Sequence, residues 1–466
     1  MTESEHGHGT SAPVAMAPLS GRLGWAMFDW ANQPFFTVIT TFIFAPFFTS
    51  VIIADPVRGQ SMWGYTQSAS GVIIAILSPI LGAMADAGGA KKPWILSFQA
   101  LTVIGCVALW WAVPGGQHTV PLVLAAVIIA TIGAEFSIVF NNALLPTLVP
   151  PERMGRLSGF GWGMGYVGGL IALFAVLIVS RPELIGIQTP PGEVLFGLDR
   201  ASHALERLTG PASALWLVAF VIPMFAFTPD TARTGLKALA AARVGVRHLL
   251  ETLRRLRHYR NQLLYLLAFM IYNDGLAAVI AFGGVYAAGT FGWSTTELGI
   301  FGICLTVFAT GGCFAGGWLD DRIGSKRTIQ IAIVGTIVAA LGIMSIGHAD
   351  IFFGVPVAPR APGGGLFSSA GEKTFMGFAL LLGICMGPMQ AASRTLIGRL
   401  APPGMVTEFY GLFALSGRAT TFMAPFLIGV FTQVSGSQRA ALVVVLVFLV
   451  VGFALLWNVK AEQPRR

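Results

Sequence analysis

The sequence predicts an all-α integral membrane protein with twelve transmembrane helices in two six-helix pseudo-repeats, and three observations support this fold class. Hydrophobic residues make up 55% of the 466-residue chain and charged residues only 11%, whereas soluble domains carry about 25% charged residues. Apolar runs of about 20 residues, long enough to cross a bilayer as a helix, recur along the chain. Two loop sequences each occur twice, once in each half. A transmembrane β-barrel would show short alternating segments instead.

The order of apolar and polar segments predicts two bundles separated by a connector. Residues 1–20 are small and polar and lack the basic and apolar regions of a signal peptide, so we expect a disordered cytoplasmic tail. A basic helix on the cytoplasmic membrane surface is expected between the bundles. The predicted units are the tail at 1–20, the N-terminal six-helix bundle at 21–230, the connector helix at 231–260, the C-terminal six-helix bundle at 261–460 and a second tail at 461–466.

Twelve apolar runs give the predicted spans, six on each side of the connector. They cover residues 24–52, 62–84, 94–113, 120–143, 157–180, 211–228, 262–288, 297–319, 328–347, 374–397, 405–431 and 439–459.

The positions of lysine and arginine predict the orientation. With the N-terminus inside, 20 of the 29 lie in cytoplasmic segments, 7 in outer segments and 2 within spans. Because cytoplasmic loops carry an excess of these residues, both termini are predicted to be cytoplasmic. The net charge of +8 then reflects loops that face anionic membrane lipid, and we expect no nucleic-acid partner. We expect a multi-pass protein of the plasma (inner) membrane, monomeric by default.

A charged loop, GWLDDRIGSKR at residues 317–327, crowds five charged side chains between two apolar runs. A weaker copy, GAMADAGGAKK, lies 235 residues earlier at 82–92. We expect Asp86 and Asp321 at helix ends, where they accept hydrogen bonds from backbone amides and pair with cations across the halves. Such contacts must break when the cytoplasmic side opens, so they would act as a gate; the alternative is a solvated charged turn.

The second copy of this loop is expected to form the stronger latch, because Ala87 stands in the first copy where Arg322 stands in the second. The residues predicted to gate are Asp86, Lys91, Lys92, Gly317, Asp321, Arg322, Gly324, Lys326 and Arg327.

A second repeat joins the fourth and fifth spans to the tenth and eleventh. An offset of 252 residues aligns Pro150-Pro151 with Pro402-Pro403 and Gly159 with Gly411. Two six-helix halves related by parallel repetition fit an alternating-access transporter, with its site near the midplane between the halves.

These motifs resemble a known family. GWLDDRIGSKR resembles the loop signature of the major facilitator superfamily. FDWANQPF, FNNALLP, GYVGG, YNDG and QAASRTLIGRLAP resemble its vacuole-effluxer-like branch, which includes the fungal autophagy-related exporter of vacuolar amino acids and bacterial members of uncertain substrate. The resemblance extends from the first to the eleventh helix. It implies the major facilitator fold, a cavity lined by helices 1, 4, 7 and 10, and amino-acid transport with export favoured.

Three of the carboxylates inside predicted spans are candidate site residues, because an ionisable group there is costly and usually faces a cavity. Asp274 lies about twelve residues into the seventh span, roughly 18 Å along it and near the midplane. We expect it to bind a substrate amine or a proton; the alternative is a structural salt bridge to Arg394 or Arg418. Glu135 is a second proton candidate, because burial favours the protonated carboxyl group. Asp29, nearer the cytoplasmic end, fits a structural pair as well as a coupling role.

Arg394 and Arg418 also fall inside spans, and a guanidinium can grip a substrate carboxylate with two hydrogen bonds. An arginine and Asp274 at the two ends of a cavity would suit a zwitterion. For Tyr166, a candidate wall residue, ordinary packing is the alternative. The remaining predicted site residues are Asn32, Asn142, Asn273 and Gln390.

No catalytic or cofactor motif accompanies these residues. A GxGxxG sequence at 163–168 lies inside an apolar span, where helix packing explains it better than a nucleotide. The four cysteines form no CxxC pair, so no metal site is predicted. We therefore expect no enzyme and no cofactor. The prediction is a secondary active transporter of small polar organic solutes, above all amino acids, coupled to protons. The alternatives are transport of another solute, such as a drug or sugar derivative, and a non-transporting membrane receptor or scaffold.

Overall fold

The computed structural model describes residues 15–235, 240, 243–247, 251, 256–293, 295–361, 365–420, 423–435 and 438–460. The predicted tails lie outside the described residues up to residue 14 and from residue 461. The predicted connector helix at 231–260 lies partly outside them, and its described part includes a helical stretch at 243–247.

The N-terminal half, up to residue 235, contains six helical spans. The first is irregular: it begins as α1 and continues through two π-helical segments, where Pro34 and Pro46 remove backbone donors from the regular helical ladder. The elements of this span are α1 (Leu19–Pro34), η1 (Phe35–Phe42), α2 (Phe44–Phe47) and η2 (Phe48–Ile52). The other five are α3 (Pro56–Gly88), α4 (Lys92–Ala108), α5 (Thr119–Leu148), α6 (Met154–Ser180) and α7 (Ala204–Phe227).

The C-terminal half, from residue 256, repeats this plan. Its helices are α9 (Arg260–Phe291), α10 (Thr295–Ile323), α11 (Ser325–Met344), α12 (Ala370–Leu400), α13 (Val406–Arg418), α14 (Met423–Ser435) and α15 (Gln438–Trp457). Two short antiparallel hairpins are β1 (Glu193–Val194) with β2 (Leu198–Asp199), and β3 (Asp350–Ile351) with β4 (Val355–Pro356). The described single-turn 3₁₀ segments are η3 (Leu109–Trp111), η4 (Pro151–Arg153), η5 (Pro182–Ile185), η6 (Leu195–Gly197) and η7 (Leu256–Tyr259).

Ten of the described helices are long and apolar enough to cross a membrane. This finding confirms the predicted all-α membrane class. The twelfth predicted span is α15, whose apolar stretch is shorter, at Leu442–Trp457. The eleventh is a correction: 405–431 is not one helix but two, α13 and α14, of 13 residues each. Pro425 lies in the first turn of α14, and a proline there has no amide with which to continue a preceding helix.

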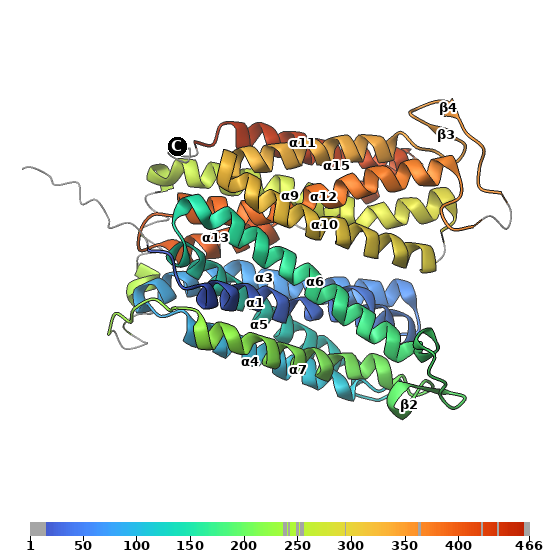
Figure 1. The fold of residues 1–466 in the computed structure, drawn as a ribbon, viewed down its shortest axis with the longest axis horizontal. Coiled ribbons are helices and arrows are strands. Elements are labelled where there is room, and N and C mark those ends of the chain that lie inside the picture. Colours follow the sequence, from blue (N-terminus) through green and yellow to red (C-terminus); the bar gives the residue numbers. More distant parts are fainter. Residues whose placement is uncertain are drawn as a thin grey trace, which may run out of the picture.

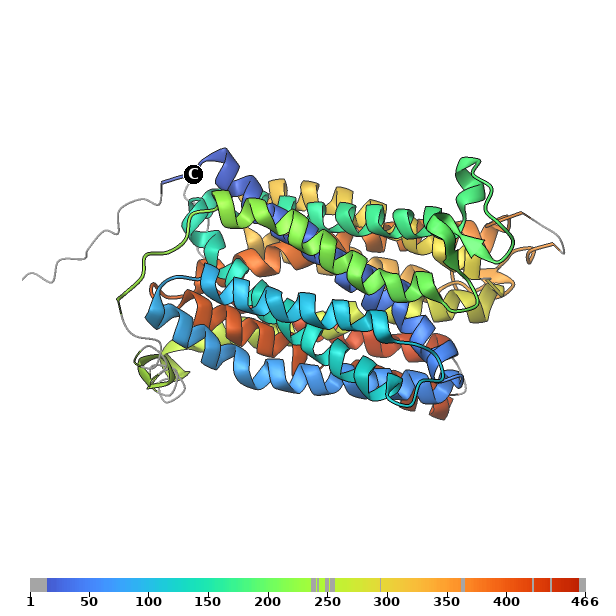
Figure 2. The ribbon, with the colours of Figure 1, turned by 90° about the horizontal axis from the view of Figure 1, so that it is seen from below.

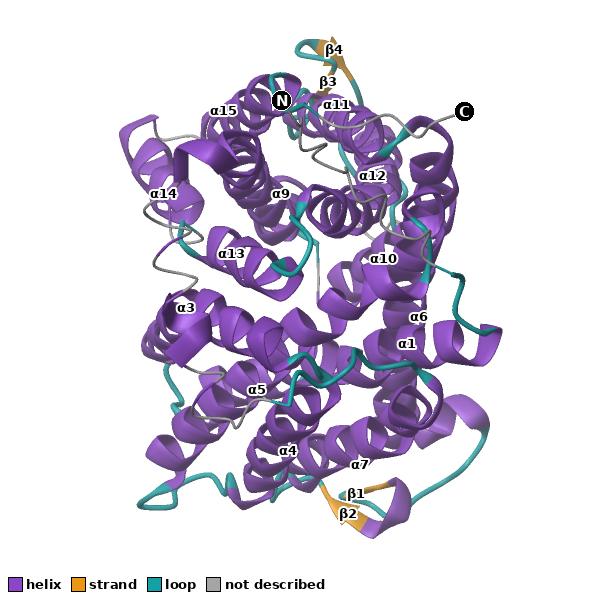
Figure 3. Cartoon of the chain, turned by 90° about the vertical axis from the view of Figure 1, so that its left-hand side faces the viewer, coloured by secondary structure: helices purple, strands orange, loops and turns teal. Residues whose placement is uncertain are grey.

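The helices run along the long axis of the molecule, and the two ends differ (Figure 1). The beginning of α1 and the end of α15 lie at one end, which we call the terminal end, and both hairpins lie at the other (Figures 1 and 2). Seen from the terminal end, α1 and α3–α7 form one group and α9–α15 the other (Figure 3). Buried apolar residues form one large cluster centred on the C-terminal half and two smaller clusters in the N-terminal half.

The halves meet most closely where α6 packs on α10 and α3 packs on α13. Glycines make both contacts possible, because a Cβ at Gly159 would collide with the backbone carbonyl of Cys313, and one at Gly411 with that of Ser78. Gly159 and Gly411 are the residues that the 252-residue repeat aligns. Cys313 and Ser78 are likewise 235 residues apart. The two interfaces are therefore copies of each other.

Candidate functional site

A first latch closes the terminal end between α3 and α13. The Asp86 carboxylate accepts hydrogen bonds from the Thr407 hydroxyl at 2.6 Å and from the Glu408 amide at 2.8 Å. The Lys91 ammonium lies 2.9 Å from the same carboxylate. Asp86 thus binds the N-terminal turn of a helix from the other half, where free amides and the helix dipole favour an anion.

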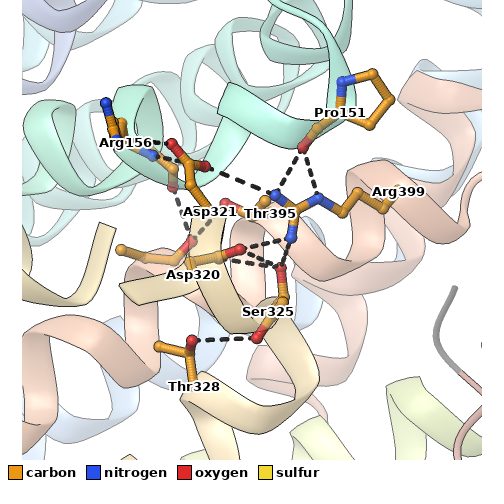
Figure 4. A network of polar contacts seen from close by, with 11 residues as sticks. Pro151, Arg156, Asp320, Asp321, Ser325, Thr328, Thr395 and Arg399 are labelled. Atoms are coloured by element: carbon orange, nitrogen blue, oxygen red, sulfur yellow. Dashed lines mark hydrogen bonds and ion pairs between the residues drawn. The ribbon is translucent and has the colours of Figure 1, made fainter. Parts of the chain in front are cut away.

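A second latch repeats this arrangement between α10 and α6. Asp321 accepts a hydrogen bond of 3.2 Å from the Arg156 amide in the first turn of α6, and it pairs with the Arg156 side chain (Figure 4). Arg156 and Glu408, the two amide donors, are 252 residues apart and so occupy equivalent positions. Each aspartate of the repeated loop therefore caps a helix of the opposite half.

The second latch has an additional buried layer (Figure 4). Arg399 of α12 pairs with Asp320 at 2.5 Å and donates two hydrogen bonds to the Pro151 carbonyl of the N-terminal half. Ser325 donates to Asp320 as well. Sequence reasoning did not select Asp320 or Arg399 for the gate, although Asp320 directly precedes Asp321 and Arg399 follows Arg394 by five residues.

The other predicted gating residues have different positions. Arg322 does not join the latch: its guanidinium lies over the Trp318 ring, 3.8 Å from the centroid. The extra contacts of the second copy come from Asp320 and Arg399 and not, as predicted, from Arg322. Lys92 donates a hydrogen bond to the Phe225 carbonyl of α7. Lys326 donates to two backbone carbonyls at the end of α15. Arg327 is exposed. Gly317 packs against the Gly155 backbone, and Gly324 adopts a positive φ of 88° before α11.

Arg394 forms the centre of a buried polar cluster between the halves. Its guanidinium lies 2.8 Å from the Asp29 carboxylate of α1 and 3.3 Å from the Asn142 side-chain oxygen of α5. It also donates to the hydroxyl and the backbone carbonyl of Ser158 on α6, at 2.9 and 2.6 Å. The Trp25 and Trp162 rings lie within cation–π distance, at 4.8 and 5.6 Å. Only 3% of the Arg394 side chain is exposed.

A second ion pair joins the halves nearer the midplane, between the half-buried side chains of Arg418 of α13 and Glu135 of α5. Counting along the helices from the terminal end gives a depth of ~9 Å for Arg394 and ~18 Å for Arg418. Both arginines of the predicted site therefore have an acidic partner from the N-terminal half. The predicted alternative, a salt bridge from Asp274 to either arginine, is not what the structure shows.

Asp274 is the exception among the buried carboxylates. It lies in α9, ~21 Å from the terminal end of that helix, and is 1% exposed. Neither carboxylate oxygen makes a hydrogen bond to any residue that the structure describes. The Thr420 hydroxyl lies close enough to act on this carboxylate, although the pair does not reach hydrogen-bond geometry. A buried carboxyl group without a partner is costly in its charged form, so it favours a proton or a bound cation.

Tyr166 and Gln390 are two further predicted residues that link the halves, whereas Asn32 does not link them. Tyr166 of α6 donates a hydrogen bond of 2.5 Å to Gln390 of α12. Asn32 instead belongs to the interior of the N-terminal half, where its side-chain oxygen accepts from Gln99 of α4. In this arrangement the Asn32 side chain projects from α1 toward α4, so its predicted place in the path stays a prediction. Asn273 is half-buried next to Asp274.

Several neutral residues that support the cluster were not among the predicted site residues, although Tyr272 was a candidate wall residue. Tyr265 of α9 donates to the Ser393 carbonyl at 2.7 Å, and Tyr410 of α13 donates to the Arg394 carbonyl at 2.9 Å. The hydroxyls of Tyr272 and Ser393 lie 2.6 Å apart. These bonds fix the α12 backbone that carries Arg394. Tyrosine is common in apolar helices, so the sequence offered no signal beyond the position of Tyr272 beside Asn273.

Three features lie at or near the interface between the halves: the two latches, the Arg394 cluster and the Asp274 carboxyl group. The latches and the Arg394 cluster hold the terminal end closed, and each connects helices of opposite halves. One buried carboxyl group, Asp274, remains available near the midplane. Such an arrangement can release an arginine when the halves part and can hold a proton or a cation when they do not.

Comparison with known proteins gives a family match and relatives. A family model described as "Vacuole effluxer Atg22 like" matches residues 52–466. The "Uncharacterized MFS-type transporter YxiO" of Bacillus subtilis is 27% identical over 448 residues and covers 94% of both chains. "Autophagy-related protein 22-1" of Aspergillus niger is 25% identical over 313 residues, which is 67% of this chain and 48% of that protein. This chain thus spans about half the length of the fungal relative.

Solved structures show the same fold. FucP, a major facilitator superfamily transporter in the outward conformation, has a TM-score of 0.68 at 16% identity and covers 95% of this chain and 99% of its own. The proton:xylose symporter XylE bound to 6-bromo-6-deoxy-D-glucose has a TM-score of 0.66 at 15% identity, with 95% coverage of both chains. These likenesses show that the chain has the major facilitator fold.

Proposed function

The chain belongs to the vacuole effluxer Atg22 like family of multi-pass membrane transporters, and from this premise we propose that it exports small zwitterionic solutes, above all amino acids, by proton-coupled alternating access. The resemblance of its motifs favours amino acids and export. The coupling of solute transport to protons is proposed on the basis of Asp274. Its carboxyl group is buried near the midplane and has no hydrogen-bond partner among the described residues.

Asp274 would bind either a proton or the ammonium group of the solute. A carboxylate can neutralise only one of these cations at a time in an apolar site, so the two would compete. Competition at a single group couples solute movement to proton movement in the opposite direction, because each ligand displaces the other. The protonated state also removes the cost of an unpaired buried charge when no solute is bound.

Arg394 would bind the carboxylate of the solute after the terminal end opens. In the closed arrangement its guanidinium is occupied by Asp29, Asn142 and Ser158, all of them from the N-terminal half. Separation of the halves removes these partners together. A solute carboxylate can then replace Asp29 with the two-pronged geometry that arginine prefers. The gating roles of Asp86 and Asp321 follow from the same movement.

The site and the charge distribution together give the proposed setting. The segments predicted to be cytoplasmic hold 20 lysines and arginines and the predicted outer segments hold 7, which favours a cytoplasmic terminal end in the plasma (inner) membrane. With that orientation, the closed latches correspond to an outward-facing state.

The proposal is tested by flux in proteoliposomes. Labelled amino acids are offered with and without an imposed pH gradient, to the wild type, to Asp274→Asn and to the control Glu183→Gln, whose side chain is 54% exposed in an outer loop. We expect gradient-driven accumulation by the wild type and the control and its loss in Asp274→Asn. N-acetylated amino acids, which lack the ammonium group, should neither be transported nor compete.

The outcomes separate the proposal from its alternatives. Normal gradient-driven transport by folded Asp274→Asn would remove Asp274 from the mechanism. Flux of a drug or sugar derivative in the absence of amino-acid flux would reject the substrate class. Solute binding without any flux would point to the non-transporting receptor.

A further inference from the structure

A hollow of about 1360 Å³ opens at the terminal end of the C-terminal half. The beginnings of α9 and α11 and the ends of α12 and α15 form most of its wall, and the N-terminal half adds Pro146, Pro151, Glu152 and Met154. None of the ten polar residues predicted for the transport path lines it. The hollow borders the second latch through Pro151, Ser325 and Arg399. It lies apart from the polar residues of the proposed solute path and needs its own explanation.

The wall of the hollow is strongly basic. Its four cationic side chains are Lys326, Arg327, Arg399 and Lys460, and its one acidic side chain is Glu152. Asp320 already neutralises Arg399. Lys326 donates to backbone carbonyls at the end of α15 and not to a carboxylate. Within the described part of the chain, Arg327 and Lys460 are exposed and form no ion pair. The hollow thus has an excess of positive charge.

The first turn of α11 adds backbone donors to this wall. α11 begins at Ser325, directly after Gly324, and no side chain caps its N-terminus. The amides of Lys326 and Arg327 have no intrahelical acceptor, because they belong to the first turn. No described side chain accepts from them either. Free amides at the positive end of a 20-residue helix attract anions, and here cations flank them.

The first copy of the repeat shows what these amides bind. Lys91 and Lys92 are the residues aligned with Lys326 and Arg327. Their amides donate to the two carboxylate oxygens of Asp230, at 2.8 and 3.1 Å. An anion therefore sits on the equivalent pair of amides in the N-terminal half.

The second copy has a cation where the first has this anion. Asp230 follows the end of α7 by three residues, and Lys460 follows the end of α15 by three. Lys460 is held at this place through its backbone, whose amide and carbonyl both bond to the Asn261 side chain. Lys460 thus stands in the second copy where Asp230 stands in the first. The hollow lies beside Lys460.

We propose that this basic hollow binds a phosphate group against the first turn of α11, either the headgroup of an anionic phospholipid or a free phosphate. A phosphate offers enough oxygens to accept from both amides and from the Arg327 and Lys460 side chains at once. It also brings the negative charge that Asp230 supplies in the other half. Basic pockets between helices at the cytoplasmic surface recognise phospholipid headgroups by the same chemistry. The inference does not rest on the identity of the transported solute.

The test measures binding through the unfolding temperature of the full-length protein in nanodiscs. One arm titrates inorganic phosphate at constant ionic strength into phosphatidylcholine nanodiscs. The other arm compares phosphatidylcholine nanodiscs with nanodiscs that contain phosphatidylglycerol. We expect a saturable rise in at least one arm. Arg327→Gln and Lys460→Gln should each weaken binding by about tenfold, the effect of one lost charge-assisted hydrogen bond.

The matched control is Lys373→Gln, which removes an exposed cation far from the hollow at the beginning of α12 and should bind as the wild type does. A rise only with phosphatidylglycerol identifies a lipid, and a rise only with inorganic phosphate identifies a soluble anion. The proposal is overturned by the absence of a saturable rise in both arms, or by an equal rise in the Arg327→Gln/Lys460→Gln double variant. It is also overturned if binding occurs only in Glu462→Gln, because the side-chain carboxylate of Glu462, two residues after Lys460, would then occupy the place.

Discussion

One side chain, Arg394, connects four helices. It lies on α12 and binds Asp29 of α1, Asn142 of α5 and Ser158 of α6. Taking a charge out of water is expensive, and the partners compensate for this only while all of them are present. Any movement that separates α12 from α1 and α6 must therefore replace these contacts. This requirement makes Arg394 a sensor of whether the halves are together.

The pair of Arg394 and Asp29 is open to a double-mutant cycle. Arg394→Gln leaves a buried carboxylate and Asp29→Asn leaves a buried guanidinium, so each should destabilise the protein by about 3–5 kcal/mol. The double variant removes both charges and should cost less than the sum of the two, by about 0.5–3 kcal/mol. Thermal or denaturant unfolding in detergent measures all four proteins. Additivity within about 0.5 kcal/mol would show that the two side chains do not act as a pair.

At the scale of helices, the closed terminal end depends on contacts between backbones. A Cβ at Gly159 of α6 would meet the Cys313 carbonyl and the Gly317 backbone of α10. Backbone atoms cannot rotate away as a flexible side chain can, so even a methyl group must push the helices apart. The same reasoning applies to Gly411 against the Ser78 backbone of α3.

Gly159→Ala should therefore shift the molecule toward a state that is open at the terminal end. Spin labels on the two halves at that end should report longer distances in Gly159→Ala than in the wild type, by pulsed electron resonance. The control is Gly311→Ala in α10, where an added Cβ meets no atom within 4 Å. An unchanged distance distribution in Gly159→Ala, with the protein folded, would argue against a backbone-limited latch.

The sequence predicted the helices well because hydropathy and span length are properties of a segment by itself. It also predicted the paired loops, since Asp86 and Asp321 lie in copies of one sequence. It did not predict which way a side chain projects. Asn32 and Asp29 are three residues apart on α1, yet Asn32 bonds to Gln99 within its own half and Asp29 to Arg394 of the other. Such partners depend on the rotation of each helix, which tertiary packing decides.

The break between α13 and α14 was missed for a related reason. Hydropathy averages over residues 405–431 and does not register a change of backbone direction. Arg418, at the end of α13, can reach Glu135 from that position. The end of α13 therefore lies beside the Arg418–Glu135 pair. Non-helical backbone at membrane depth is tolerated where protein surrounds it or where it lines a cavity.

At the scale of the whole molecule, the two halves are joined by equivalent contacts at one end. Asp86 binds the Glu408 amide and Asp321 binds the Arg156 amide, so each half supplies both a carboxylate and a helix N-terminus. The contacts are reciprocal, and the loss of one weakens the surface that holds the other. The ion pairs of Arg394 and Arg418 extend the same closure toward the midplane. If the proposed gating holds, we expect the terminal end to open as a unit and not one helix at a time.

The side of the membrane that this end faces can be measured directly. The charge distribution predicts a cytoplasmic terminal end, so an exposed cysteine there should be protected in intact cells. Three of the four native cysteines are buried and Cys304 is half-buried, which keeps the background low. Ser202→Cys, exposed in the loop before α7, should react with a membrane-impermeant maleimide in intact cells. Glu152→Cys, exposed at the terminal end, should react only after permeabilisation. The reverse pattern would invert the orientation, make the closed latches an inward-facing arrangement, and place the basic hollow on the outer surface.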